Sequence, residues 1–519
     1  MCRKNATSAR TLTSSPKART ACVLLGLIAG VIAQPATGGA APAALRVGIE
    51  SEIQGFDPLR TPVMGVATLT VARALFDTLV ELDSEGHIEP ALALRLEPAA
   101  DLMSWTATLR PDVVFHDGTP FDAAAVAGHY SRLLDPANKC ACRSFIGPIA
   151  RVVAVDAHTV RFELSRPWAA LPAVLGEPSV VSLIGSPRAV ADTAREFQRN
   201  PVGTGPFALE QWTSGDRVVV RREPRHWRAA SPTLEGIEFR VLPDEQTRLA
   251  ALRSGELDVI WTQSPASALK ARSEKLAVQT QVGAGARLLV LNTRVTPLDD
   301  ANVRRAFSLA IDPVELARVF SEGLAPPVTD PFGPKTAFAC PASDGVRHDL
   351  DAARKLLRDY GKPVHLKLLH TNTPRGLEAA QIMQAMWGAA GAEIELVPVE
   401  QGQLVQRVLK GDYEIGAWRI RDSFDPDPDL YGLLQSQSPF NVTGLRSEAI
   451  DRLLVEGRTQ LDLTERRATY CRLSRTLADE APFVYLAPNI YFAVSGPRVQ
   501  GTPGLPGGIL DLRTLSLAR

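Results

Sequence analysis

A short acidic run near the C-terminal end is the most conspicuous candidate for chemistry in this 519-residue chain. Asp425-Pro-Asp-Pro-Asp429 alternates like a calcium-binding loop, in which carboxylate oxygens coordinate the cation. A helix–loop–helix calcium site also needs Gly at loop position 6 and Glu at position 12, and here those places hold Leu430 and Ser436. Two prolines stiffen the segment. The run therefore predicts a rigid acidic turn after a strand, and no calcium site.

Other residue types show no metal-binding or catalytic spacing. His365 and His370 are the nearest pair of the eight histidines, and five residues suit neither one helix face nor strand alternation. The sequence has no G-x-S-x-G nucleophile elbow, no His-Glu-x-x-His motif and no phosphate loop. Gly283-Ala-Gly285 lacks the third glycine of a dinucleotide fingerprint. We therefore predict no catalytic residue, no metal and no cofactor, and hence a protein that is not an enzyme.

The first 44 residues have the three parts of a secretory signal. Five basic residues and no acidic ones precede or flank an apolar run over residues 21–33, and a small-residue stretch follows. An uncleaved membrane anchor is the alternative, but a spanning helix needs about 20 apolar residues and this run has 13. We predict cleavage between Ala36 and Ala44, which would place the mature protein in the periplasm.

Composition describes an ordinary globular protein of several domains. The chain is 45% hydrophobic, and its mean hydropathy is −0.02. It has 57 basic and 57 acidic residues, so no basic surface for nucleic acid is indicated, and loss of the leader leaves an excess of five acidic residues. Four cysteines remain: Cys140, Cys142, Cys340 and Cys471. Because Cys140 and Cys142 are so close in sequence, we expect one of them to have a distant partner, and the pairing stays open.

The elements that must position any site alternate between strand and helix. Strands are predicted at residues 45–49 and 393–399, and around Trp105–Leu109 and Val160–Leu164, where apolar and polar residues alternate. Helices are predicted over residues 66–80 and 376–390, and after the N-caps Asp122, Asp300 and Asp312. A hairpin is expected where Leu209 and Val218 flank a tight turn. The class is α/β with mixed sheets.

Several motifs occur in a fixed order through nearly all of residues 45–490. They are Gly55-Phe-Asp-Pro58, Trp105 to Phe121, Asn200 to Phe207 with Trp212 and Gly215-Asp216, Pro224 to Trp227, Leu291-Asn-Thr293 with Asp300 to Asp312, and Trp418 with Asp425-Pro-Asp427. Together they resemble the family 5 extracellular solute-binding proteins, the peptide- and nickel-type receptors of ABC importers. The resemblance implies a bilobed periplasmic-binding-protein fold of type II with an additional domain, which closes around its ligand.

The resemblance also implies domain boundaries and partners. Lobe I would combine residues 45–75, 200–280 and 490–519, the additional domain would be 76–199, and lobe II would be 281–489. The receptor would be a monomer that captures a peptide or peptide-like solute and delivers it to ABC permease subunits in the membrane. Three alternatives stay open: a non-peptide solute such as a nickel chelate, haem or an opine, a secreted hydrolase, and a sensory receptor that does not transport.

Dipeptide binders of this family suggest the ligand contacts. Asp422, which follows Trp418, stands at the position where those binders have an Asp that pairs with the ligand's amino group. Trp418 would face either the cleft or the core. At the position where those binders have an Arg that pairs with the ligand's carboxylate, this sequence resembles them but has His370, and Arg375 lies five residues further on. A neutral histidine cannot replace a bidentate guanidinium. This departure weakens the case for a free dipeptide, and leaves longer peptides and other solutes open.

Overall fold

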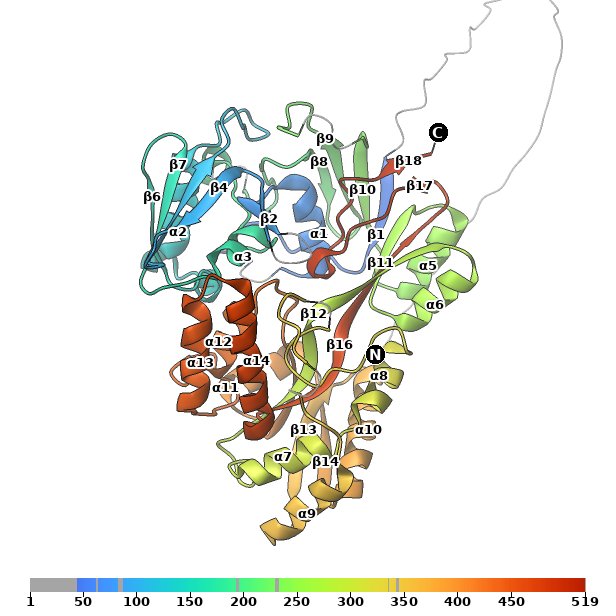
Figure 1. Ribbon diagram of the computed structural model, residues 1–519. Helices are drawn as coiled ribbons and strands as arrows, with labels where there is room; N and C mark the ends of the chain where they lie inside the picture. The colour runs from blue at the N-terminus through green and yellow to red at the C-terminus, as the bar shows by residue number, and fades with distance from the viewer. Residues whose placement is uncertain are drawn as a thin grey trace, which may run out of the picture. The chain divides into compact units, whose positions relative to one another are not determined.

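Two long antiparallel strands, β12 (Ala277–Leu291) and β16 (Phe483–Ser495), run through the centre of the computed structural model (Figure 1). They are neighbours in a ten-stranded sheet of order β14-β13-β15-β12-β16-β11-β1-β10-β9-β8. We call the strands from β11 to β8 the first half of this sheet, and β15, β13 and β14 the second half. The structure describes residues 44–518, except 62–63, 83–86, 193–195, 229–232, 335 and 342–344. The predicted signal segment lies outside the described residues, apart from its last residue.

The first half of the sheet is mixed and carries both ends of the described chain. Its strands are β1 (Leu45–Ile49), β8 (Phe207–Thr213), β9 (Arg217–Arg222), β10 (Gly236–Val241) and β11 (Val259–Thr262). Its other elements are α1 (Val66–Leu75), α5 (Glu245–Ser254), α6 (Pro265–Ser273), β17 (Val499–Gln500), η4 (Pro506–Gly508) and β18 (Ser516–Leu517). The predicted hairpin is confirmed, because β8 pairs antiparallel with β9.

A separate four-stranded antiparallel sheet follows α1 in the chain. It consists of β4 (Ala93–Pro98), β5 (Ser104–Leu109), β7 (Thr159–Leu164) and β6 (Ile149–Ala154), in that spatial order. Around it lie β2 (Val80–Leu82), β3 (Ile88–Pro90), α2 (Ala123–Leu134), η1 (Pro136–Asn138), η2 (Ala141–Phe145), α3 (Leu171–Gly176) and α4 (Pro187–Ala191). One continuous hydrophobic cluster joins this small sheet to the first half, with Phe162 from one and Phe239 from the other.

The second half is a three-layer arrangement of helix, sheet and helix. Its parallel strands are β13 (His365–Thr371), β14 (Glu393–Val399) and β15 (Ile415–Arg419). One face, the α10 face, is covered by α7 (Ala301–Leu309), α8 (Pro313–Ser321), α9 (Leu350–Tyr360) and α10 (Pro374–Ala390). The other, the α11 face, is covered by α11 (Gln401–Lys410), α12 (Asp427–Leu434), α13 (Glu448–Thr459) and α14 (Leu463–Glu480).

Most of the predicted elements are confirmed, and one helix is shorter than predicted. The strands at residues 45–49 and 393–399 match, and Asp122, Asp300 and Asp312 each cap a helix through the side chain. The helix predicted over residues 66–80 ends at Leu75, because Phe76 is extended. The carbonyl of Leu75 accepts a hydrogen bond from Gly205 N, and a Cβ at Gly205 would lie 2.5 Å from the Leu75 backbone. A distant turn therefore packs where the helix would continue.

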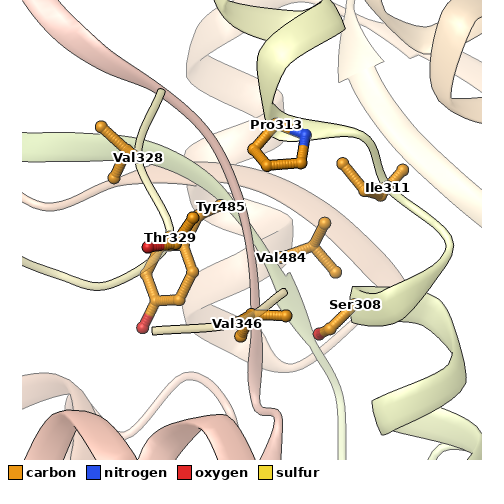
Figure 2. A pocket seen from close by; sticks show the side chains of 8 residues that line it. All are labelled: Ser308, Ile311, Pro313, Val328, Thr329, Val346, Val484 and Tyr485. Atoms are coloured by element: carbon orange, nitrogen blue, oxygen red, sulfur yellow. The ribbon is translucent and has the colours of Figure 1, made fainter. Parts of the chain in front are cut away.

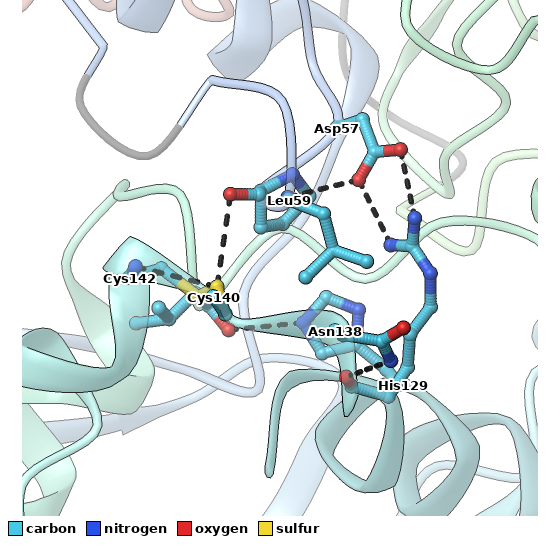
Figure 3. Close-up of a disulfide and its surroundings, with 9 residues drawn as sticks. Asp57, Leu59, His129, Asn138, Cys140 and Cys142 are labelled. Atoms are coloured by element: carbon cyan, nitrogen blue, oxygen red, sulfur yellow. Dashed lines mark hydrogen bonds and ion pairs between the residues drawn. A yellow bond between two sulfur atoms is a disulfide. The ribbon is translucent and has the colours of Figure 1, made fainter. Parts of the chain in front are cut away.

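The cysteine pairing corrects our expectation of a distant partner for Cys140 or Cys142. These two residues bond to each other, with Cα atoms 5.1 Å apart (Figure 3). That separation lies within the range a disulfide requires, because Cys140 caps the tight η2 turn that contains Cys142. The second disulfide joins Cys340 to Cys471 in α14, across 131 residues of chain.

Replacing both Cys340 and Cys471 by alanine is expected to lower the free energy of unfolding by about 2–5 kcal/mol, because the bond closes a long loop in the unfolded chain. The matched replacement of Cys140 and Cys142 by alanine should cost only about 1–2 kcal/mol, because that loop is very short. Urea unfolding of the two double variants under non-reducing conditions measures the difference. Equal losses would contradict the loop-length argument.

Candidate ligand-binding site

The carboxyl ends of β13 and β15 form a switch point in the second half. The chain leaves β13 into α10 on one face, whereas it leaves β14 into α11 and β15 towards α12 on the other face. Loops that diverge to opposite faces open a crevice at the carboxyl ends of parallel strands, and this is the usual ligand position in such sheets. All four predicted ligand-binding residues lie at this edge.

His370 and Arg375 lie at the end of β13 and the start of α10. His370 is 3% exposed, its Nδ1 is 2.9 Å from the Thr371 carbonyl, and its Nε2 has no partner among the described residues. If Nδ1 donates to that carbonyl, a neutral ring leaves Nε2 as an acceptor. Arg375 is half-buried in the first turn of α10, and its Nη2 donates to the Phe320 carbonyl at 2.6 Å. Thr373 caps this helix.

Trp418 and Asp422 come from the end of β15 and the loop after it. Trp418 is partly buried, pairs with Leu288 of β12 and packs against the core of the α11 face. Asp422 accepts hydrogen bonds from Gly285 N at 2.8 Å on Oδ1, and from Asn489 Nδ2 at 2.9 Å and the Tyr491 hydroxyl on Oδ2. Burial raises the pKa of Asp422 above its ordinary value, against these hydrogen bonds and the positive charge of Arg419.

Two glycines of β12 allow this loop to approach the strand. A Cβ at Gly283 would lie 2.0 Å from Asp422 Oδ1, and a Cβ at Gly285 would lie 2.2 Å from the Ile420 carbonyl. Any larger residue would displace Asp422 from its donors on β12 and β16. The pair that fails as a dinucleotide fingerprint thus has a different role, which is close backbone approach.

The three acidic residues of the run from Asp425 to Asp429, unlike Asp422, each form an ion pair with an arginine of the protein. Asp425 pairs with Arg466, Asp427 with Arg458 and Asp429 with Arg421. The prediction of a turn holds only up to Pro426, because α12 begins at Asp427, and the arginines stabilise this junction. By contrast, no lysine or arginine of the described residues lies within ion-pair distance of Asp422. The described residues also contain no cluster of three or more His, Cys, Asp or Glu that could hold a metal ion.

Two arginines that sequence reasoning missed complete this edge. Arg287 of β12 and Arg419 of β15 are directly opposite each other in the antiparallel register. Burial lowers the pKa of Arg287, and the positive charges of Arg375 and Arg419 lower it further. No sequence motif marks these residues, because only the pairing of β12 with β15 brings them together.

Comparison with known proteins explains this arrangement. Residues 87–441 match the model of the bacterial extracellular solute-binding proteins, family 5 middle region. The chain belongs to the family 5 solute-binding proteins. It is 29% identical over 535 residues to the "Probable di/tripeptide-binding protein 5" of Pseudomonas aeruginosa, covering 96% of this chain and all of that one. It is 27% identical over 484 residues to the glutathione-binding protein GsiB of Shigella dysenteriae, covering 90% and 93%.

Solved structures of family 5 proteins share the fold. The periplasmic binding protein DppA of Helicobacter pylori, in complex with the peptide STSA, superposes with a TM-score of 0.78 at 25% identity, covering 92% of this chain and 98% of that one. The predicted fold class is confirmed: a bilobed, mixed α/β periplasmic-binding-protein fold of type II. The family consists of binding proteins. No helix among the described residues is long and apolar enough to cross a bilayer.

In this family 5 protein, the segment after the small sheet contacts the loop that carries Asp422. Trp168 Nε1 donates to Asp427 Oδ2 at 2.6 Å, and Ala169 N donates to the Arg458 carbonyl at 2.8 Å. Glu177, which ends α3, accepts hydrogen bonds from the Ser423 hydroxyl at 2.6 Å and from Phe424 N. The segment after the small sheet therefore contacts the chain at Ser423, Phe424 and Asp427, and Asp422 itself is held by β12 and β16.

Glu177 is expected to make stability depend on pH. Burial raises its pKa from 4.5 to about 7, against the bonds from Ser423 and Phe424 and the charge of Arg421, while Asp429 adds to the rise. The unfolded state loses the proton first as pH rises, so the free energy of unfolding should fall between pH 4.5 and 7, by up to about 3 kcal/mol, and then level off. Urea unfolding at pH 5, 6, 7 and 8 should show a smaller fall in Glu177→Gln. The exposed-site variant Glu395→Gln should retain the full fall, and equal slopes for all three proteins would contradict this assignment.

A small cavity in the second half is separate from this edge. Eight residues line it: Ser308, Ile311, Pro313, Val328, Thr329, Val346, Val484 and Tyr485 (Figure 2). Most of its wall is hydrocarbon, and the buried Tyr485 hydroxyl has no partner among the described residues. None of the predicted ligand-binding residues lines it, so it does not bear on the assignment of the site.

Proposed function

We propose that this family 5 protein captures a peptide or peptide-like solute with a free amino group and delivers it to ABC permease subunits. The ligand would lie at the carboxyl edge of β13 and β15, between the two halves of the sheet. Its amino group would bind Asp422, and its carboxylate would approach Arg375 and the unpartnered edge of His370. Trp418 would then contact the ligand through the part of its ring that the core leaves exposed.

The observation that carries this proposal is the missing counter-ion of Asp422. The three acidic residues of the run each have an arginine partner, whereas every hydrogen-bond donor to Asp422 among the described residues is neutral. A carboxylate has about four acceptor positions, of which three are used here. A ligand ammonium at the fourth position would supply both the remaining hydrogen bond and the missing charge.

The similarity to peptide-binding proteins supports the same ligand class. The relative from Pseudomonas aeruginosa is named for di- and tripeptides, the Shigella relative for glutathione, and the Helicobacter structure holds a peptide. All three names describe ligands with an amino group and a carboxylate. A nickel chelate or haem would need other partners for these residues, and a hydrolase would need a nucleophile and base at this edge. An opine with an amine and carboxylates offers the same groups as a peptide and counts here as a peptide-like solute.

The remaining assignments follow from this role. We place the mature protein in the periplasm as a monomer, after removal of the leader between Ala36 and Ala44. We divide it into lobe I (45–75, 200–280 and 490–519), the additional domain (76–199) and lobe II (281–489). The long β12 and β16 would be the hinge strands between the lobes.

Native mass spectrometry of the exported protein, purified without refolding, tests the proposal. Denaturing release should identify bound peptides, because receptors that bury a ligand retain it during purification. The same spectra should give an N-terminus between residues 37 and 45. A bound non-peptide compound or metal complex would keep the fold and overturn the ligand. An empty protein would be titrated with a peptide library by calorimetry, where absence of binding would count against the proposal.

A further inference from the structure

We propose that Arg287, Arg375 and Arg419 form an anion-binding subsite that selects ligands with two carboxylates at the end opposite the amino group. This inference rests on the proposed function, because it names the subclass of peptide-like solute that the same site takes. Net-acidic peptides, and peptide conjugates with a second carboxylate, are the chemical class that fits.

Two like charges lie directly opposite each other in the strand register of β12 and β15. Arg287 and Arg419 are a directly opposed pair on neighbouring antiparallel strands, so their side chains leave the same face of the sheet. Like charges in such a pair destabilise the protein. Neither side chain has a hydrogen bond or an ion pair within the part of the chain that the structure describes. An anion between them would remove this repulsion and use their donors.

Arg375 lies at the start of the helix α10, which covers the same face of the sheet. Leu289, two residues from Arg287 along β12, and Ile415, four residues from Arg419 along β15, pack in the core of the α10 face. Because side chains alternate between faces along a strand, Arg287 and Arg419 lie on that face too. Arg375 lies in the first turn of the 17-residue α10, where the helix dipole has its positive end and no acidic residue is present. A cation in that place is unfavourable unless an anion is bound nearby.

The charges of Arg375 and Arg419 both act on Arg287. The pKa of Arg287 is lowered by burial first, and then by the charges of Arg375 and Arg419, while Tyr491 and Asp422 oppose this. The bond from Arg375 to the Phe320 carbonyl is the one hydrogen bond recorded for any of the three within the described residues. The donors of a planar guanidinium match a carboxylate bidentately, so most of their capacity is unused.

The net positive charge of the three arginines favours a ligand with two carboxylates over a ligand with one. The charge of Asp422 acts on Arg287, and the charge of Arg419 acts on Asp422, but the hydrogen bonds of this carboxylate come from other donors. The single carboxylate of a neutral peptide would leave the subsite with excess positive charge in a partly buried place. A second carboxylate brings the site and ligand close to neutrality, which the half-buried Arg287 and Arg375 favour more than the exposed Arg419.

Binding of matched peptides tests this inference in the mature wild-type protein. Calorimetry would compare peptides of two to four residues that end in Glu with the same peptides ending in Gln, which differ by one charge. The Glu forms should bind at least 10-fold more tightly, and the preference should fall below 3-fold in Arg287→Gln and in Arg419→Gln. Arg151→Gln, at an exposed strand position of the small sheet, is the matched control and should keep the preference. Equal affinities for Glu and Gln forms would overturn the inference.

A ligand-independent measurement separates this inference from the proposed function. Without ligand, Arg287→Gln and Arg419→Gln should each raise Tm by about 1–2 °C, because each removes one of two opposed charges. Glutarate, as a simple dicarboxylate probe, should raise Tm of the wild type but not of the two variants at equal ionic strength. If glutarate acts in this way and no peptide binds, the subsite stands and the peptide ligand falls. If neither measurement distinguishes the variants from Arg151→Gln, the subsite is overturned.

Discussion

Asp422→Asn is expected to weaken binding of a peptide with a free amino group by about 2–5 kcal/mol, which is roughly 30- to 4,000-fold in Kd. The substitution keeps the size of the side chain but removes the charge that the ligand ammonium would need. It also places an amide near Gly285 N, Asn489 and Tyr491, which now donate to a carboxylate. Calorimetric titration with the peptide recovered from the exported protein measures the loss.

Two controls connect this loss with the ammonium. The N-acetylated form of the same peptide should bind weakly to the wild type, and the substitution should change its affinity little. Asp359→Asn, at an exposed helix position, should leave both affinities unchanged. A Kd for the free peptide that is unaltered in Asp422→Asn would show that this carboxylate does not contact the ligand.

The largest loss of stability is expected for Asp427→Ala. The Asp427 side chain is fully buried and accepts bonds from Arg458 at 2.8 and 3.1 Å and from Trp168 at 2.6 Å. Its removal leaves the buried Arg458 charge without a carboxylate, and breaking a buried pair from one side costs about 3–5 kcal/mol. Urea unfolding followed by tryptophan fluorescence gives the change in free energy.

An exposed pair provides the comparison for this value. Asp412 pairs with Arg407 at 2.8 Å, but its side chain is 69% exposed, so Asp412→Ala should cost less than about 1 kcal/mol. A loss below 1 kcal/mol in Asp427→Ala as well would mean that the Arg458 guanidinium finds solvent or another partner. In that case the buried ion pair of the acidic run would not stabilise the loop that carries Asp422.

Local signals in the sequence were sufficient for many of the elements. Asp122, Asp300 and Asp312 cap their helices as predicted, because a cap depends only on the side chain and the next three residues. The α1 helix was overestimated because the turn at Gly205, distant in sequence, packs against its end. The Cys140–Cys142 bond was missed because spacing alone does not show that a tight turn brings the two Cα atoms to 5.1 Å.

In the candidate site, too, the sequence indicates which residues matter and the tertiary structure decides where they lie. Asp422, Trp418, His370 and Arg375 were placed by motifs that resemble the family, and the structure positions all four at the carboxyl edge of β13 and β15. Whether each contacts a ligand remains a prediction.

The sequence by itself determined the family, the absence of recognisable catalytic motifs and the acidic run, because these depend on residue types in a fixed order. Only the tertiary structure decided which charges are neutralised. Asp425, Asp427 and Asp429 pair with arginines, whereas Asp422, Arg287 and Arg419 have no ion-pair partner in the part of the chain that the structure describes. Ion pairing is a matter of a few ångströms between residues far apart in the chain, and strand register and loop approach set those distances.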